Sequence, residues 1–288
     1  MPSYDPAWLD RMYNNRALVP AHPAYFERWA AESAALRDSL PVHVDLRYGE
    51  GPNETLDVIP AEKPGAPVLV FIHGGYWRAL DKSEHSFVAR PFHDHGVCVV
   101  VPNYALCPGT PERPIGIPDI ALQMAHALEW TWRNIAAYGG DPSRITVAGH
   151  SAGGHLAAML LGCDWKAVAP DLPAGLVRNA LSISGLFDLR PIQHTPFLAP
   201  ALNLTDADSL RVSPALWPAP ARGKLYTVAG GDESAEFLRQ NRLIRDAWGA
   251  GVVPVCEALP GLHHFSVLDT LADPGLRLHA LAMELLEA

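Results

Sequence analysis

The chain has 288 residues, 49% of them hydrophobic and 18% charged, so it can bury a large core and is not expected to be disordered. Its 22 basic and 31 acidic residues give a formal net charge of −9, which argues against a nucleic-acid or anionic membrane partner. No apolar run approaches the ~20 residues of a membrane helix, and the first fifteen residues do not read as a secretory signal. Four well-separated cysteines indicate free thiols in a reducing cytoplasm: Cys98, Cys107, Cys163 and Cys256.

The first predicted element is a helical arm over residues 6–38, which is interrupted near Pro20 and Pro23. An early hairpin follows, and six short runs rich in Val and Ile then alternate with longer periodic segments. The hairpin is expected at 42–47 and 56–59, and the buried strands at 68–72, 97–101, 145–148, 180–184, 225–229 and 252–258. Helices are expected at 82–95, 118–138, 152–161, 235–250 and 266–287.

This alternation predicts an α/β fold with a mostly parallel central sheet and helices on both faces. We expect a single domain over residues 1–288, with the helical arm at 1–40 as its N-terminal part. Ligands of such sheets bind at the carboxyl ends of the strands, so the residues that follow each strand are the candidates for a functional site.

One strand is followed by a G-x-S-x-G pattern, Gly149-His150-Ser151-Ala152-Gly153, which leads into a predicted helix. A tight strand-to-helix turn of this kind strains the serine and exposes its hydroxyl group. Side chains at positions 149 and 153 would collide in such a turn, and the start of the new helix favours an anion. A chance match is the alternative, but the strand–turn–helix context favours Ser151 as a nucleophile.

An upstream strand ends in the sequence HGGYW at residues 73–77. Two glycines let the backbone approach a substrate and direct its N–H groups at one point. We expect an oxyanion hole formed by backbone N–H groups of Gly74, Gly75 or Tyr76 together with that of Ala152. The alternative is an ordinary glycine turn after a strand.

A serine hydroxyl becomes a good nucleophile when a histidine takes its proton. The nucleophile elbow is typical of a fold in which the chain order is serine, acid, histidine, and the pair His263-His264 follows the last predicted strand. We prefer His264 as the base, with His263 as the second choice. Asp232 and Glu233 follow the preceding strand. The direction of their side chains decides which one faces His264, and the sequence alone does not show that direction. The spacing from Gly230 favours Glu233, since many hydrolases carry G-x-x-D at this point.

Several other residues give weaker signals. His73 is expected to brace its loop rather than to act as a base, and Trp77 either belongs to the core or lines the acyl pocket as a substrate-binding residue. The histidine-rich stretch of the 82–95 segment contains metal-ligand residue types but none of the strong metal-binding spacings, so no metal is expected there. That stretch comprises His85, His93, Asp94 and His95.

Four stretches carry a resemblance: HGGYW at 73–77, GHSAGGHLA at 149–157, SGLFDLRP at 184–191 and GDESAEFLRQ at 231–240. They are similar to the animal and fungal kynurenine formamidases (arylformamidases) of the α/β-hydrolase superfamily. The resemblance spans most of the chain from Val68 onward, and the arm resembles that of bacterial members. It implies Ser151 as nucleophile, His264 as base and Glu233 as acid, where the animal enzymes carry Asp and where Asp232 stays an alternative.

The resemblance implies a serine hydrolase that cleaves a formyl-amide or small acyl bond, most simply N-formylkynurenine to kynurenine and formate, without a metal or organic cofactor. The alternatives are a carboxylesterase for short-chain acyl esters and a non-catalytic binding protein on the same fold. We expect a small-molecule substrate as partner, no nucleic acid and no membrane, and a cytoplasmic location. A homodimer stays open, as does whether the arm covers the pocket of its own chain or of a neighbour.

Overall fold

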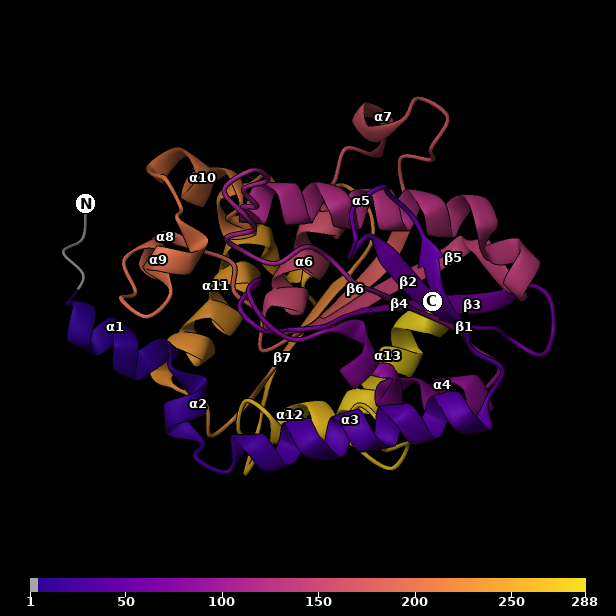
Figure 1. Ribbon diagram of the computed structural model, residues 1–288, viewed down its shortest axis with the longest axis horizontal. Helices are drawn as coiled ribbons and strands as arrows, with labels where there is room; N and C mark the ends of the chain where they lie inside the picture. The colour runs from indigo at the N-terminus through magenta and orange to yellow at the C-terminus, as the bar shows by residue number, and fades with distance from the viewer. Residues whose placement is uncertain (1–4) are drawn as a thin grey trace.

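A computed structural model describes residues 5–288 and arranges them around one eight-stranded sheet (Figure 1). The strand order is β1-β2-β4-β3-β5-β6-β7-β8. The two pairs that involve β2 are antiparallel, and the other five neighbouring pairs are parallel. The strands are β1 (His43–Arg47), β2 (Thr55–Ile59), β3 (Ala66–Ile72), β4 (Cys98–Pro102), β5 (Gly140–His150), β6 (Val177–Ile183), β7 (Leu225–Gly230) and β8 (Val255–Leu259). The predicted hairpin and mostly parallel sheet are therefore confirmed.

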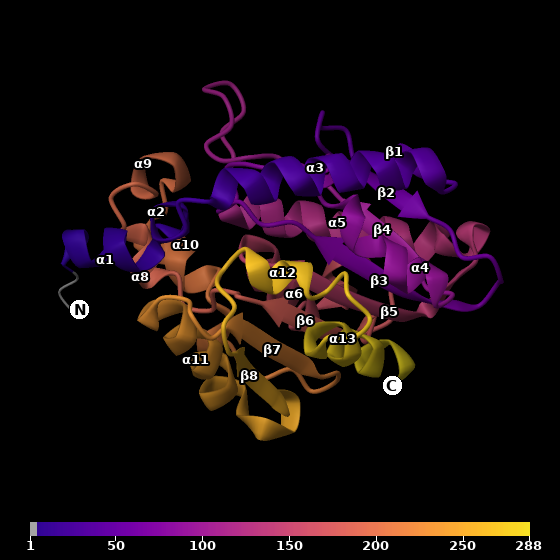
Figure 2. The ribbon, with the colours of Figure 1, turned by 90° about the horizontal axis from the view of Figure 1, so that it is seen from below.

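Helices cover both faces of the sheet, as the alternation of elements predicts (Figures 1 and 2). The first face carries α5 (Ile117–Asn134), α6 (Ala152–Leu161) and α11 (Ala235–Val252). The second face carries α4 (Arg90–Asp94), α12 (Ser266–Asp269) and α13 (Arg277–Glu287). The central strands are buried on both faces, which explains why they read as continuous apolar runs rather than as alternating patterns.

The N-terminal arm forms three helices, α1 (Pro6–Tyr13), α2 (Asn15–Leu18) and α3 (His22–Ser39). The predicted interruption is confirmed, since Pro20 lies between α2 and α3 and Pro23 lies in the first turn of α3, where a missing N–H costs little. In Figure 1, α1 lies beside α11, and α3 runs along the outside of the second helical layer.

Two predicted helices are broken in the structure. Residues 82–95 form two short 3₁₀ turns, η1 (Lys82–Glu84) and η2 (Ser86–Ala89), before α4, in which Pro91 occupies the first turn. Residues 266–287 form α12 and α13 rather than one helix, because Pro274 and the glycine after it interrupt the chain.

A set of short helices was not predicted from the sequence, and several strand boundaries differ from the predicted ones. The first of the short helices follows α6 and the others lie between β6 and β7, where frequent prolines hide the periodic pattern. They are α7 (Trp165–Val168), α8 (Arg190–Gln193), α9 (Ala199–Leu202), α10 (Asp206–Arg211) and η4 (Pro214–Leu216). The last strand begins at Val255 instead of at residue 252, because α11 extends through Val252.

A buried ion pair ties the segment after β3 to the antiparallel side of the sheet. Lys82 Nζ lies 2.5 Å from Asp57 Oδ1 on β2 and 2.8 Å from Asp45 Oδ1 on β1. Burial opposes the charge of Lys82, but its hydrogen bonds to the two aspartates raise its pKa above the usual value. Asp57 is 1% exposed, so Lys82 compensates a carboxylate that water barely reaches.

Replacing Lys82 with Met should destabilise the protein strongly, because Asp57 would stay buried without a counter-charge. We expect the free energy of unfolding to fall by about 3–5 kcal/mol, measured by urea denaturation followed by circular dichroism. The exposed Lys63 offers a matched control, and Lys63→Met should change the same quantity by less than about 0.5 kcal/mol. Equal stability of the two variants would contradict a structural role for the pair.

Candidate active site

Ser151 lies at a strained turn between β5 and α6. Its φ and ψ are 57° and −115°, a conformation that side-chain-bearing residues rarely adopt. A Cβ atom added to Gly149 would lie 2.2 Å from the carbonyl oxygen of Gly153, and one added to Gly153 would lie 2.0 Å from that of Ile72. The prediction that both positions require glycine is therefore confirmed, and the turn has the geometry of a nucleophile elbow.

The HGGYW loop passes directly beside this elbow. A Cβ atom added to Gly74 would lie 3.2 Å from Ser151 Cβ, and one added to Gly75 would lie 2.1 Å from the carbonyl oxygen of Ala79. Gly75 and Tyr76 both have positive φ, 102° and 50°, and both line a cavity together with Ser151. Ala152 begins α6, so its N–H has no acceptor within the helix. Gly74 and Ala152 thus lie beside the serine, and Gly75 and Tyr76 line the same cavity.

His73 braces this loop from the core. It is fully buried, its Nδ1 lies 2.9 Å from the Gly74 carbonyl oxygen, and its Nε2 lies 3.1 Å from Asn103 Oδ1. The hydroxyl of Tyr104 donates to the carbonyl oxygens of His73 and Gly74, and its ring stacks on His73 with centroids 4.3 Å apart. Burial lowers the pKa of His73, so the ring stays neutral and acts as a structural support.

Trp77 does not line the cavity, so its prediction as a substrate-binding residue requires correction. Its side chain is fully buried, and its ring lies edge-on to His155 with centroids 5.0 Å apart. Tyr76 and Trp77 both have positive φ, 50° and 57°, and the turn that they form places the tyrosine at the cavity and the tryptophan in the core. The alternative in the sequence analysis, that Trp77 belongs to the core, describes its position.

Glu233 and His264 form a short hydrogen bond. The distance from His264 Nδ1 to Glu233 Oε2 is 2.7 Å, and both side chains are almost completely buried. Glu233 Oε1 accepts a hydrogen bond from the Gly230 N–H at 2.7 Å and another from the Ser184 hydroxyl. Asp232, in contrast, is exposed to solvent. Side-chain direction therefore selects Glu233 of the two neighbouring carboxylates as the partner of His264.

The second-choice histidine is held elsewhere, and a third histidine supports the base. His263 Nε2 lies 3.2 Å from the hydroxyl of Tyr25, on the arm. His150 is buried, and its Nε2 lies 2.8 Å from the backbone carbonyl oxygen of His264. Burial holds the pKa of His150 well below its usual value, so the ring is neutral. The sequence analysis missed this role, because the variable position of G-x-S-x-G carries no signal of its partner.

Ser151 and His264 both line one cavity of about 370 Å³. Its walls combine the elbow, the HGGYW loop, the loop that carries His264 and the N-terminal arm. The other lining residues are Asn14, Asn15, Arg16, Phe26, Trp29, Gly75, Tyr76, Arg78, Ala79, Leu80, His150, Phe197 and Phe265. The wall is thus rich in aromatic side chains and carries two arginines. Because the arm supplies part of it, the arm covers the pocket of its own chain.

The first part of the arm contacts the HGGYW loop and the loop at residues 231–234, which carries Glu233 and is called the acid loop below. The Tyr76 hydroxyl donates to the carbonyl oxygen of Tyr13 at 2.6 Å, and the Ser234 hydroxyl donates to that of Met12 at 2.5 Å. The Tyr13 hydroxyl donates to Glu236 Oε2 at 2.6 Å. Burial, followed by the nearby Glu236, raises the pKa of Tyr13 far above its usual value, so the phenol stays a donor.

The third helix of the arm contacts the loop that carries His264. Trp29 Nε1 donates to Asp269 Oδ1 at 2.7 Å, and an Arg28 nitrogen donates to Asp269 Oδ2 at 2.7 Å. The rings of Phe26 and Phe265 meet edge to face, with centroids 5.4 Å apart. The arm thus contacts the loops of the acid and the base as well as the HGGYW loop.

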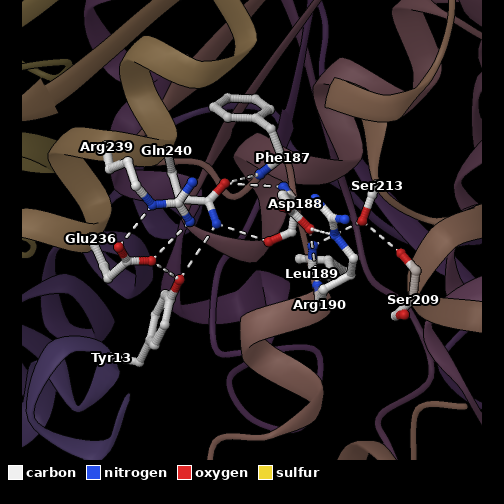
Figure 3. A network of polar contacts seen from close by, with 10 residues as sticks. All are labelled: Tyr13, Phe187, Asp188, Leu189, Arg190, Ser209, Ser213, Glu236, Arg239 and Gln240. Carbon is white, nitrogen blue, oxygen red and sulfur yellow. Dashed lines mark hydrogen bonds and ion pairs between the residues drawn. The ribbon is translucent and has the colours of Figure 1, made fainter. Parts of the chain in front are cut away.

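A polar network fixes the start of α11, directly after Glu233 (Figure 3). Gln240 Oε1 accepts hydrogen bonds from the N–H groups of Phe187 and Asp188, and its Nε2 donates to the Asp188 carbonyl oxygen. Glu236, on the same helix, accepts from Tyr13 and pairs with Arg239. The network therefore joins the segment after β6, helix α11 and the arm, and it holds the acid loop in place.

Residues 5–288 contain neither a metal-site cluster nor a membrane-length apolar helix. No three or more His, Cys, Asp or Glu side chains of this range come together as ligands for an ion. The histidine-rich stretch of residues 82–95 contributes to no such cluster in this range. No helix in this range is both long enough and apolar enough to cross a membrane.

Comparison with known proteins gives consistent results. Residues 48–189 match the model of the carboxylesterase family. Kynurenine formamidase of Danio rerio is 29% identical over 98% of this chain and 94% of its own length, and that of Drosophila melanogaster is 30% identical over 82% and 79%. A crystal structure from Silicibacter sp., provisionally described as a thioesterase, is 33% identical with a TM-score of 0.83, covering 96% of this chain and 98% of that one.

The geometry of the acid loop predicts very different effects at its two carboxylates. Glu233→Gln should lower kcat for p-nitrophenyl acetate by about 10³–10⁴, because a neutral amide cannot stabilise the imidazolium or fix the tautomer of His264. Asp232→Asn, which changes an exposed neighbour, serves as the matched control and should stay near the wild-type rate. Equal and mild losses in the two variants would contradict the assignment of Glu233.

Proposed function

This chain belongs to the kynurenine formamidase family of the α/β-hydrolases and is a hydrolase, and we propose that Ser151, His264 and Glu233 form its catalytic triad. The proposal rests on one observation: Ser151 in its strained conformation and His264, which is hydrogen-bonded to Glu233, line the same cavity. These elements come from three separate strand ends, which is the arrangement that nucleophilic catalysis needs in this fold.

In the proposed reaction, Ser151 Oγ attacks the carbonyl carbon of the substrate while His264 Nε2 takes the hydroxyl proton. Glu233 stabilises the resulting imidazolium through the bond to Nδ1 without taking its proton. The carbonyl oxygen becomes an oxyanion, and the N–H of Ala152 with those of Gly74, Gly75 or Tyr76 would stabilise it. Removing one such donor typically costs about 10²–10³ in rate.

The tetrahedral intermediate then collapses. His264 gives its proton to the leaving amine, the C–N bond breaks, and the formyl group stays on Ser151 Oγ as an ester. A water molecule attacks this ester while His264 takes one of its protons, and the proton then returns to Ser151 Oγ. Formate leaves and the serine is restored, so the sequence consumes one water and needs no cofactor.

We propose N-formylkynurenine as the substrate and kynurenine and formate as the products. Two curated relatives named for this reaction match this chain over most of their length. The aromatic cavity wall supports an aryl leaving group, because Phe26, Tyr76 and Phe197 offer apolar ring surfaces near Ser151. The small formyl group also suits a serine closely flanked by the Gly74 backbone.

A carboxylesterase for short acyl esters is the second candidate function. The match of residues 48–189 to the carboxylesterase family favours it, since the elbow and the HGGYW loop lie in that range. An ester is cleaved more easily than an amide, so the same triad would serve both reactions.

The four cysteines are free thiols, which supports the proposal of a reducing cytoplasmic location.

Ser151→Ala should lower kcat by roughly 10³–10⁶, because the members of a triad act as a unit and the nucleophile would be missing. The rate of p-nitrophenyl acetate hydrolysis measures the effect. Ser143→Ala is the control, since Ser143 is an exposed serine near the opposite end of β5. Retention of the wild-type rate by Ser151→Ala would refute a serine-nucleophile mechanism.

Two substrates separate the two candidate functions. We expect the ratio of kcat/KM for N-formylkynurenine to kcat/KM for p-nitrophenyl acetate to be at least about one, because a formamidase must overcome the lower reactivity of the amide through binding. Both constants are measured on the purified protein under one set of conditions. A ratio far below one would favour the carboxylesterase.

A further inference from the structure

Two arginines line the cavity without an apparent role in the triad chemistry. Arg16 lies on α2 of the arm, and Arg78 follows the HGGYW loop directly. Each guanidinium group lies over an aromatic ring of the same cavity: Arg16 over Phe26 at 5.4 Å, and Arg78 over Phe197 at 5.6 Å. Both positive charges are thus held at the cavity by ring contacts that leave their N–H donors available to a ligand.

Neither arginine forms an ion pair within residues 5–288, whereas most of the ion pairs in that range involve an arginine. The charge of Arg16 opposes the rise that burial causes in the pKa of Glu84. Glu84 Oε2, however, accepts a hydrogen bond from the Asp81 N–H as part of a helix cap. Partial burial, followed by the nearby charge of Arg16, lowers the pKa of Arg78. Two cations that repel each other here would be stabilised by an anionic ligand.

Asn15 adds an unused hydrogen-bond donor to the same wall. It is 5% exposed, it lines the cavity directly before Arg16, and its amide Nδ2 has no hydrogen-bond partner. Leaving a buried amide without a partner is costly, so such groups are typically satisfied by a ligand or by water. This observation is independent of the charges and points to the same part of the cavity.

We propose that Arg16 and Arg78 form a subsite for the carboxylate of an aromatic substrate, with Asn15 as an additional donor. The proposal rests on the proposed function, because it places the substrate in the cavity beside Ser151. A guanidinium fork matches a carboxylate with two parallel hydrogen bonds, and the rings of Phe26 and Phe197 offer flat surfaces to the aryl group. The subsite would select anionic aryl compounds over neutral ones of the same shape.

Calorimetric titration with 3-benzoylpropionate and with its neutral amide tests the subsite directly, without any turnover. We expect the wild-type protein to bind the acid at least tenfold more tightly than the amide. Arg16→Gln and Arg78→Gln should each reduce this preference about tenfold, and Arg78→Lys should restore part of it through its point charge. Arg11→Gln is the control, because Arg11 lies exposed on the same arm and does not line the cavity.

The result separates the subsite from the catalytic proposal. Equal binding of acid and amide by the wild-type protein would overturn the subsite, and so would an unchanged preference in both Gln variants. Selective binding of the acid in a protein that does not deformylate N-formylkynurenine would keep the subsite and refute the proposed reaction. If the formamide is cleaved, the Gln variants should raise KM for N-formylkynurenine much more than they lower kcat.

Discussion

The site depends on how closely helix α6 approaches the end of β3. Gly153 lies so near the Ile72 carbonyl oxygen, and Gly149 so near Gly153, that a single methyl group at either position would push the helix away. This contact forces Ser151 into its strained conformation and brings Gly74 against it. The dense packing of the interior stores the strain, since the carboxyl ends of β3, β5 and β6 beside the turn are buried and leave it no room to relax.

The N-terminal arm is the second organising feature, and it acts through side chains rather than through the sheet. The backbone carbonyl of Tyr13 accepts a hydrogen bond from the side chain of Tyr76 in the HGGYW loop, and the Tyr13 hydroxyl donates one to Glu236 on α11. The Trp29 ring N–H donates to Asp269, which follows His264. The arm therefore fixes the positions of the HGGYW loop, the start of α11 and the segment after His264 relative to one another, although no strand pairing joins them. It also brings Arg16 to the cavity, so the same segment both supports the loops around Ser151 and His264 and forms part of the cavity wall that they face.

Most of the fold follows from the sequence, because buried parallel strands and a glycine-rich elbow leave strong local signals. Ser151 and His264 were predictable from their places after strands, and both lie at the cavity. The spacing from Gly230 and the family resemblance favoured Glu233 over Asp232, but the order of elements along the chain could not decide between them. In the structure Glu233 faces His264 and accepts a hydrogen bond from the distant Ser184, whereas Asp232 faces solvent. Trp77 was ambiguous for the same reason: Tyr76 and Trp77 are neighbours in one loop, and only the folded structure shows that the first lines the cavity and the second is buried in the core.

The arm and the loop of His264 lie about as far apart along the chain as two segments can, and yet they meet around one cavity. During synthesis, Tyr25 of the arm is made 238 residues before His263, with which its hydroxyl group interacts. The ring of Trp29 can stack on Phe87 early, but its hydrogen bond to Asp269 can form only after the last strand of the sheet has been made. The arm therefore reaches its final position over the cavity only after all eight strands of the sheet have been made.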